Sequence, residues 1–456
     1  MENKIFSCLE EMREIFISDL CEIVKIPSVA SEDVESVHKC AKWLESFFEQ
    51  IGITPIVDYS ANQPVILAEV KGETDTSILF YGHYDVVPAN PDEWSYPPFG
   101  ATIEDGKIFG RGTVDDKAQI LAPLEAVRAF LQCGRKPPVT VKFLFEGEEE
   151  LGSPSLGTIL DKYHNFLYCD ALVNYDDCVW YDGRPRVVCG LKGGVSFSLT
   201  TRMNREFHGM MHSIIPGAIW RLLWAINSLM DQNGNILIEN FFDDVIEPTE
   251  QELKAAADLN WDSRGLLIEA GIKEFIGGKS TTEAVNAFIF NTAIGISGIS
   301  GGYVYPERKG VVPAYATADV HISLVPNQTA EKVIRKVESH LQKNGFDDVE
   351  ITLRRSSNLW ARTPIDSDIS MAMAQSLQDS FKNKNGVAFQ PSYAGSGPEG
   401  VFQKLFPNME QAYSGFGPAE SRIHAPDEYI VIEDYLIGIE SVVRLMELYA
   451  QKKNNK

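Results

Sequence analysis

Apolar and polar positions alternate with two different periods along this 456-residue chain. Residues 4–25 and 33–51 repeat apolar positions every three to four residues, the period of an amphipathic helix. Between later helical stretches lie short apolar runs, at 65–67, 78–81, 139–145 and 171–173. Runs of this length, separated by helices, are typical of buried strands in an α/β sheet. The first part of the chain is therefore predicted to be an α/β domain.

Beyond residue 190 the pattern changes. Residues 195–201 alternate like a strand with one exposed face, and the edge of this strand is expected to be free to pair with a second copy of the chain. Residues 285–289 and 314–325 are expected to be further strands. Amphipathic helices are expected at 216–230 and 330–342. Alternating strands with segregated helices predict an α+β domain in this part of the chain.

The length also favours two domains, because a single hydrophobic core rarely serves so many residues. Helical patterns at 366–381 and 432–450, with a Gly/Ser loop at 394–400 between them, resemble the first part of the chain again. We therefore expect residues 1–190 and 359–456 to form one domain, with residues 191–358 inserted as a second.

Composition narrows the function classes. The formal net charge of −23 argues against nucleic acids and anionic membranes as partners. Seven scattered cysteines without a CxxC pair favour a reducing compartment. The N-terminal helix is interrupted by acidic residues, so it lacks the core of a signal peptide, and no apolar run approaches a membrane span. A cytoplasmic protein is expected.

Histidines and carboxylates gather where the predicted strands end. His83 and Asp85 follow the run 78–81, and Glu148-Glu149-Glu150 follows the run 139–145. A ligand histidine often donates its second ring N–H to a carboxylate, a role that Asp85 can fill. Three adjacent carboxylates repel one another unless cations or solvent intervene. A turn histidine and a solvated acidic loop are the alternatives.

Three more segments add candidates. Asp115-Asp116 opens a helix after a glycine-rich turn, Asp176-Asp177 follows the run 171–173, and His424 lies near the C-terminus. Open α/β sheets bind ligands at the edge where their strands end. One carboxylate can bridge two cations about 4 Å apart, although a helix cap would also explain Asp115. His208, before the helix at 216–230, is a loop histidine that could donate to an oxyanion. Together these segments predict a two-metal hydrolase.

In this order the motifs resemble those of the co-catalytic dizinc exopeptidases and deacylases, metallopeptidase family twenty. This family includes carnosinases, bacterial dipeptidases, glutamate carboxypeptidases, aminoacylases and acetylornithine or succinyl-diaminopimelate deacylases. The resemblance runs from Lys25 to His424. It implies an α/β, zinc-exopeptidase-like catalytic domain with a mixed central sheet, and an inserted α+β lid or dimerisation domain.

The resemblance also implies roles for single residues. His83 and Asp177 would bind one zinc, Glu150 and His424 the other, and Asp115 would bridge them. The choice of Asp177 over Asp176 rests on Asp177-Cys178-Val179-Trp180, which looks like the Asp-x-x-Trp of the carnosinase-like branch. The peptide bond after Asp115 is a candidate for the cis form that the family often has.

The catalytic roles follow in the same way. Glu149 would be the general base, Asp85 the partner of His83, and His208 a residue lent to the active site of a partner subunit in a homodimer. Ser396 lies in a loop that resembles a substrate-contacting loop of the family.

Two departures from the family concern substrate binding. The family usually has Arg before Leu-Val-Pro, where this chain has Ser323, and the upstream Asn corresponds to Gly295. The family's Asp-x-His-Ser-Gly reads Glu206-Phe207-His208-Gly209-Met210 here, and His212-Ser213 is a competing match. Arg308 or Arg362 is expected to substitute for the missing arginine, unless the substrate lacks a free carboxylate there.

The sequence therefore predicts a metal-dependent hydrolase of dipeptides or small peptides, of the dipeptidase or carboxypeptidase type, that uses metal-activated water and a glutamate base. Zinc is the first expectation, and manganese or cobalt also suits mixed His/carboxylate sites. An N-acyl-amino-acid deacylase with the same centre is the alternative. A metal-dependent binding protein without catalysis is a third possibility, but it would have no need of Glu149.

Overall fold

The computed structural model describes residues 2–354 and 359–454, which form two compact units. Unit 1 consists of three segments, Met1–Gly190, Arg362–Pro391 and Val401–Lys456. Unit 2 consists of Leu191–Ala361 and Ser392–Gly400. Unit 2 extends three residues past the expected second boundary and also takes in residues 392–400, which the sequence pattern placed in the catalytic domain.

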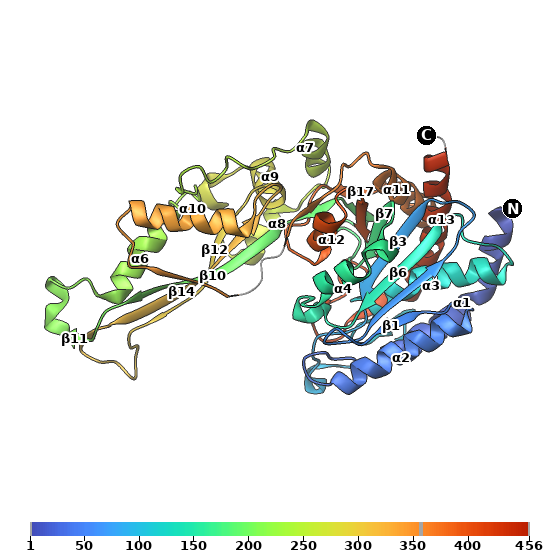
Figure 1. Cartoon of the computed structure of the whole chain (residues 1–456), viewed down its shortest axis with the longest axis horizontal. Coiled ribbons are helices and arrows are strands. Elements are labelled where there is room, and N and C mark those ends of the chain that lie inside the picture. Colours follow the sequence, from blue (N-terminus) through green and yellow to red (C-terminus); the bar gives the residue numbers. More distant parts are fainter. Residues whose placement is uncertain (1, 355–358, 455–456) are drawn as a thin grey trace. The chain divides into compact units, whose positions relative to one another are not determined.

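An eight-stranded mixed sheet organises unit 1 (Figure 1). The strands β6, β3, β7 and β18 run parallel, whereas β1 and β2 are antiparallel additions at one edge. The apolar runs of the sequence form the central strands, which are buried on both faces. In spatial order the strands are β1 Ile56–Asp58, β2 Val65–Val70, β6 Thr140–Glu146, β3 Ser77–His83, β7 Ala171–Tyr175, β18 Glu410–Ser414, β8 Arg186–Val188 and β17 Ala388–Gln390.

Helices complete unit 1. The most buried of them, α3, is apolar on nearly every side and packs against α1, α13 and β3. A helix that is apolar all round requires such complete burial. The helices are α1 Glu2–Val24, α2 Val34–Gln50, α3 Lys117–Gln132, α4 Leu156–Lys162, α5 His164–Leu167, α11 Asp368–Phe381, α12 Glu399–Leu405 and α13 Ile432–Asn454. A small sheet adds β4 Thr102–Glu104, β5 Lys107–Phe109 and β19 Tyr429–Val431.

Unit 2 is built on a four-stranded antiparallel sheet in the order β12-β14-β10-β15. The helix α6 packs on β10 and β14, and α10 contacts α6. Alternate residues of β10, such as Phe197 and Leu199, are buried in the core beside these helices. The strands are β10 Gly193–Arg202, β12 Ile294–Gly301, β14 Tyr315–Leu324 and β15 Glu350–Leu353, and the two helices are α6 Gly217–Leu229 and α10 Ala330–Lys343.

Two expectations about unit 2 were wrong. Residues 285–289 are not a strand but part of α9 (Thr281–Phe290), which follows α7 (Glu250–Ala257) and α8 (Ser263–Ala270). A capping box of Ser280 and Glu283 starts α9, and this local signal outweighs the strand preference of a short apolar run. In addition, β10 is not an edge strand, because β14 and β15 pair with both of its sides.

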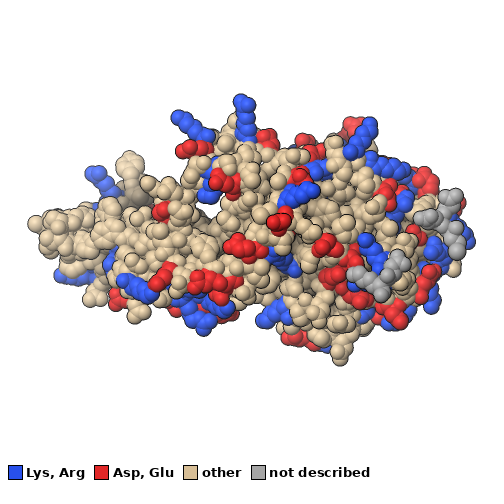
Figure 2. Space-filling view, turned by 90° about the horizontal axis from the view of Figure 1, so that it is seen from above, with Lys and Arg blue, Asp and Glu red and all other residues tan. Residues whose placement is uncertain are grey.

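Short elements complete the chain. They are β9 Gly190–Leu191, β11 Phe207–His208, β13 Val311–Val312, β16 Ala361–Arg362 and the 3-10 turns Pro91–Glu93, Glu149–Leu151, Gly209–Ser213 and Ile276–Gly278. Within the described ranges, no helix has the length and apolar character of a membrane span. On the face drawn in Figure 2, acidic and basic side chains are interspersed, so the acid excess is spread out there.

Candidate metal centre

Parallel strands bring the predicted ligand residues of unit 1 to one edge of the sheet. His83 ends β3, Glu150 lies in the turn after β6, and Asp176 follows β7 directly. Since β6, β3 and β7 are parallel neighbours, their carboxyl ends meet at the same rim (Figure 1). Asp115 lies just before α3, and His424 lies in the loop before β19. We refer to these five residues as the ligand cluster.

The ligand cluster consists of two groups that share Asp115. In the first group, the ring nitrogen Nε2 of His83 lies 3.0 Å from Oδ1 of Asp115 and 3.7 Å from Oδ2 of Asp176. In the second, Nε2 of His424 lies 2.8 Å from Oδ2 of Asp115 and 3.3 Å from Oε1 of Glu150. Within each group the ligand atoms lie within 4.8 Å of one another. The two oxygens of Asp115 thus face different groups, as a bridging carboxylate requires.

The structure places Asp176 in the cluster where the sequence led us to expect Asp177. Asp177 is turned away, and its carboxylate accepts hydrogen bonds from the guanidinium of Arg186 and from the backbone N–H of Cys178. Arg186 also lies over the ring of Trp180 and donates to Gln390. An aspartate already paired with a buried arginine is a poor candidate for a metal ligand. Asp176 directly follows β7, the strand that contains the apolar run 171–173. This position after a buried strand is the sequence signal that favours Asp176 over Asp177.

Asp85 connects the histidine to the acidic turn. Its backbone carbonyl lies 3.0 Å from Nδ1 of His83, and its carboxylate oxygen Oδ1 lies 3.4 Å from the same atom. The carboxylate also accepts hydrogen bonds from the backbone N–H groups of Glu149 and Glu150, each at 3.1 Å. Asp85 therefore orients the His83 ring and fixes the turn that carries Glu149 and Glu150.

Glu149 belongs to neither ligand group, although it adjoins Glu150. Burial raises the pKa of its carboxyl well above the usual value, and the charges of Asp176, Glu146 and Asp115 add to this effect. A carboxyl with a raised pKa is suited to accept and return a proton near neutral pH.

The electrostatics of the cluster favour added positive charge. Burial opposes ionisation of Asp115, but contacts with His424 and His83 outweigh it and lower the pKa of the carboxyl. Contacts with Asp115 and Glu150 raise the pKa of His424 to about 10. Protons on the histidines thus balance the crowded carboxylates when no other cation does so. A divalent cation in each group would supply that charge instead.

The donor set fits such cations. Two imidazoles and three carboxylates are the ligand types of zinc, manganese and cobalt sites. Among the described residues, the buried atoms Nε2 of His83 and Oε1 of Glu150 make the close ion-pair contacts given above but no hydrogen bond of good geometry. A buried polar atom without a partner is costly unless a ligand satisfies it. The peptide bond between Asp115 and Asp116 is cis, as the family resemblance implied.

The expected substrate-binding residues lie outside the cluster. His208 ends β11 in unit 2, where its exposed ring accepts a hydrogen bond from the backbone N–H of Met210. Ser396 is exposed in the 392–400 segment of unit 2. Arg362 begins the second segment of unit 1 and is half-buried. These roles stay predictions.

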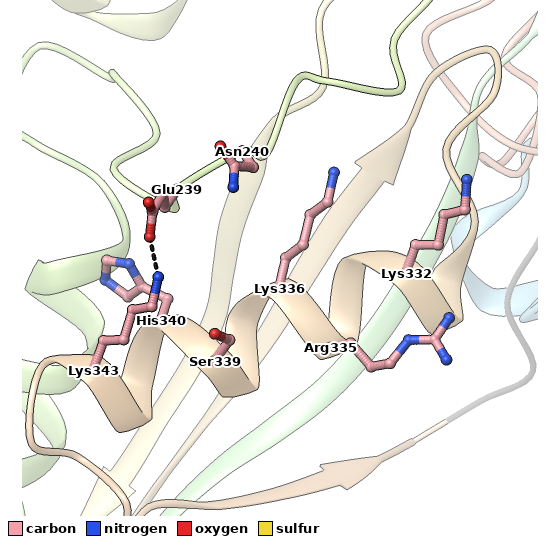
Figure 3. Close-up of a pocket in the computed structure, with 8 residues that line it drawn as sticks. All are labelled: Glu239, Asn240, Lys332, Arg335, Lys336, Ser339, His340 and Lys343. Atoms are coloured by element: carbon pink, nitrogen blue, oxygen red, sulfur yellow. Dashed lines mark hydrogen bonds and ion pairs between the residues drawn. The ribbon is translucent and has the colours of Figure 1, made fainter.

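A separate hollow of about 300 Å³ lies along α10 in unit 2 (Figure 3). It is mostly basic and has one acidic side chain. We call it the α10 hollow, and it is lined by Glu239, Asn240, Lys332, Arg335, Lys336, Ser339, His340 and Lys343. With a single carboxylate and a single imidazole among these residues, it does not offer the donor set of a metal centre.

Comparison with known proteins gives consistent matches. The sequence profile of peptidase family M20/M25/M40 matches residues 79–448. The Beta-Ala-His dipeptidase of Homo sapiens is 26% identical over 411 residues, covering 83% of this chain and 79% of that protein. The Cys-Gly metallodipeptidase DUG1 of Saccharomyces cerevisiae is 24% identical over 482 residues, covering 99% of this chain and 98% of that protein.

Solved structures also match. The M20 family metallo-carboxypeptidase Sso-CP2 from Sulfolobus solfataricus has a TM-score of 0.85 and 30% sequence identity. The match covers 96% of this chain and 99% of that one. The predicted fold class is confirmed by this similarity and by the mixed sheet of unit 1.

Proposed function

Because the chain belongs to peptidase family M20/M25/M40, we propose that it is a metal-dependent dipeptidase that hydrolyses the amide bond of dipeptides or similar small peptides. The observation that carries this proposal is the pair of ligand groups sharing Asp115, with Glu149 adjoining them. The names of two relatives, a Beta-Ala-His dipeptidase and a Cys-Gly metallodipeptidase, support the substrate class. The deacylase alternative has no comparable support.

In this proposal, His83 and Asp176 would hold one divalent cation, Glu150 and His424 would hold the other, and Asp115 would serve both. Zinc is the preferred ion, and manganese or cobalt also suits these donors. When bound, such ions polarise a substrate carbonyl and make water acidic enough to lose a proton near neutral pH.

The protein's own groups then move the protons. The Glu149 carboxylate takes a proton from the attacking water and returns it to the nitrogen of the leaving amine. Asp85 keeps the His83 ring in place, and its carboxylate holds Glu149 in position by accepting a hydrogen bond from the Glu149 backbone N–H. His208 from a partner subunit donates a hydrogen bond to the oxyanion.

An activity screen tests the function. The metal-free protein is reloaded with zinc, manganese or cobalt and assayed on dipeptides, N-acetyl amino acids and N-succinyl amino acids. We expect metal-dependent hydrolysis of dipeptides, with Glu149→Gln inactive under the same conditions. Faster turnover of the acyl amino acids would instead support the deacylase, and turnover of none of the three classes would contradict the proposal.

Carboxylate recognition requires a cation other than residue 323. The Ser323 hydroxyl accepts a hydrogen bond from the backbone N–H of Ala293 at 2.8 Å and carries no charge. We assign the role to Arg362 or Arg308, because guanidinium binds carboxylate in a bidentate way. Comparing a dipeptide with its C-terminal amide, in the wild type and in variants of each arginine, measures the contribution. A preference for the free acid that survives removal of both arginines would exclude both.

We also propose a homodimer in which each subunit lends His208 to its partner. The edge strand β12 exposes most of its length, including Ile296 and Ile299. The helix α6 also exposes apolar side chains, because Trp220 and Trp224 stack on each other and are about half exposed. An exposed edge and an apolar helix face can each pair with a second copy across a two-fold axis.

Mixing two inactive variants tests the shared site. Hybrids of His208→Ala and Glu149→Gln subunits contain one site in which both residues are intact. With random pairing, about half of the dimers are hybrids, so activity should recover to roughly a quarter of the wild-type value. Absence of recovery after verified subunit exchange, or a fully active monomer, would rule out the arrangement.

A cytoplasmic location is the last part of the proposal. All seven cysteines are free thiols, which suits a reducing compartment. Cell fractionation with an antibody against the protein tests this directly, and recovery from an oxidising compartment would contradict it.

A further inference from the structure

Glu428 lies four residues after His424 and is fully buried. Its carboxylate accepts four hydrogen bonds from the segment that precedes α3. Oε2 accepts from the guanidinium of Arg111 at 2.5 Å and from the backbone N–H of Gly112 at 3.1 Å. Oε1 accepts from the backbone N–H groups of Val114 at 2.9 Å and Asp115 at 3.2 Å. The acceptor sites of the buried carboxylate are thus directed at the turn that ends in Asp115.

Two further hydrogen bonds connect the same two loops, again with donors in 110–115 and acceptors in 424–428. The backbone N–H of Gly110 donates to the carbonyl of Glu428 at 2.9 Å, and Arg111 donates to the carbonyl of Ala425 at 3.4 Å. Arg111 itself is 3% exposed and lies over the ring of Trp94. The segments 110–115 and 424–428, more than 300 residues apart in sequence, therefore form one hydrogen-bonded assembly.

The loop that bears His424 depends on such outside support. Arg422, His424 and Asp427 have positive φ angles of 62°, 61° and 60°. Residues other than glycine adopt this left-handed region only at a cost of about 1 kcal/mol or more each, and they keep it when surrounding contacts fix the loop. The described bonds of Glu428 and Arg111 are contacts of this kind.

We infer that Glu428 is a positioning residue for the ligand cluster, a role that rests on the proposed metal-dependent function. By binding the backbone of Asp115 while forming part of the His424 loop, it sets the separation of two ligands of the same cation. A carboxylate is required, because each oxygen faces two N–H donors. In Glu428→Gln one oxygen becomes an NH₂ group, which places donor against donor at one of the two pairs.

The inference predicts an asymmetric loss of metal affinity. Glu428 supports two ligands of the group of Asp115, Glu150 and His424, because it binds the backbone of Asp115 and is part of the His424 loop. It supports only one ligand, Asp115, of the group of His83, Asp115 and Asp176. Outer partners of metal ligands typically contribute roughly 10- to 100-fold in affinity. We expect a loss of that size for one cation and a clearly smaller loss for the other.

Calorimetric titration of the metal-free protein with Zn²⁺ measures both affinities without relying on catalysis. Glu428→Gln is compared with wild type and with Glu125→Gln. Glu125 is a matched control because it is also a fully buried glutamate beside an arginine, Arg128, but it lies on α3 away from the ligand loops. Circular dichroism and thermal melting establish which variants fold. Arg111→Lys serves as a second variant, because it keeps Glu428 and the charge but loses the forked contact with Glu428 and Ala425.

The expected result is two-ion binding by wild type and Glu125→Gln, with one affinity selectively weakened in Glu428→Gln and, to a lesser extent, in Arg111→Lys. If Glu428→Gln does not fold, Arg111→Lys decides the question. Equal weakening of both ions, or wild-type affinity in every folded variant of Glu428 and Arg111, would overturn the positioning role. Two-ion binding without hydrolysis of any peptide would refute the proposed function, but the effect of the variants on metal affinity could still be measured.

Discussion

The ligand cluster of unit 1 and the α10 hollow of unit 2 both gather ionisable side chains, but they balance charge in opposite ways. In the cluster, the His83 side chain is 1% exposed and Asp115 10%, and three carboxylates face two imidazoles. In the α10 hollow, Lys343 pairs with Glu239 (Figure 3), both 61% exposed. Lys332 and Lys336 of the hollow pair with Asp244, which lies outside the lining residues. Solvent and ion-pair partners already balance the charges of the side chains in the α10 hollow. The ligand cluster is mostly buried, apart from the half-exposed His424 ring, and its carboxylates need a cation from outside. This difference distinguishes a site from a charged surface.

Removing one carboxylate from each region should give the largest contrast. Asp115→Ala is expected to lose both cations and all measurable turnover, because the same side chain faces both ligand groups. Asp244→Ala, in unit 2, should keep both cations and full activity. Elemental analysis of the two purified variants measures this directly. Two tightly held ions in the Asp115 variant would contradict the bridge.

The next contrast lies within the acidic turn of unit 1. Glu149→Gln should retain both cations and lower kcat by roughly 10²- to 10⁴-fold, the usual effect of removing a general base. Glu150→Gln, one residue further on, should instead weaken binding of the cation shared with His424. Steady-state kinetics combined with metal titration separates the two effects. Equal behaviour of the two variants would remove the distinction between base and ligand.

A buried cation in unit 2 tests whether burial, rather than the sign of the charge, makes the difference. The Lys192 ammonium donates to the backbone carbonyls of Phe288 and Asn291, and burial lowers its pKa to about 8. The unfolded chain holds this proton up to about pH 10.4. Unfolded protein therefore binds more protons between these values, and the free energy of unfolding should rise with pH by on the order of 3 kcal/mol.

Urea unfolding at pH 7.5, 9 and 10 measures this slope, with Lys192→Met as the comparison. The variant should lack the rise, and its stability relative to wild type should fall as the pH increases. Parallel pH profiles of the two proteins would show that the burial of Lys192 has no such effect.

The smallest effect is expected for an exposed pair of the α10 hollow. A double-mutant cycle on Glu239 and Lys343 should give a coupling of about 0.2–1 kcal/mol that shrinks as salt is added. Activity should not change. A coupling of several kcal/mol, insensitive to salt, would mean that the hollow is not an ordinary solvated surface.

The sequence predicted the site best where chemistry and strand pattern coincide. His83 and Glu150 follow apolar runs that became β3 and β6, and the structure brings both into the cluster. The choice between Asp176 and Asp177 could not be made from the sequence, because the motif match favours Asp177 whereas the structure pairs Asp177 with Arg186. Arg186 follows a turn, and the pattern of apolar and polar positions does not predict the conformation of that turn.

Other parts of the molecule lacked a readable signal. Glu428 stands in a polar stretch and looks like a surface residue, since no periodicity marks a charge that backbone N–H groups will surround. The helices between 250 and 290 expose much of their surface, so their amphipathic pattern is weak. Only their N-terminal caps mark them, a capping box in α7 and α9 and the N-cap Asp262 in α8. The segment 392–400 joined unit 2 through tertiary contacts that sequence position alone does not reveal.

The insertion of unit 2 has a consequence for synthesis on the ribosome. β7 pairs with β18, which is made about 235 residues later. At roughly 5–20 residues per second, that delay lasts roughly 10 to 50 s. Throughout it, the nascent first segment carries an apolar strand edge that its own chain cannot yet cover, and an uncovered edge invites aggregation. We expect ribosome-bound chains stopped within the inserted segment, once β7 has left the exit tunnel, to bind chaperones and to be cut readily by protease, whereas full-length chains should resist. Equal resistance of both would mean that the first segment protects β7 by itself.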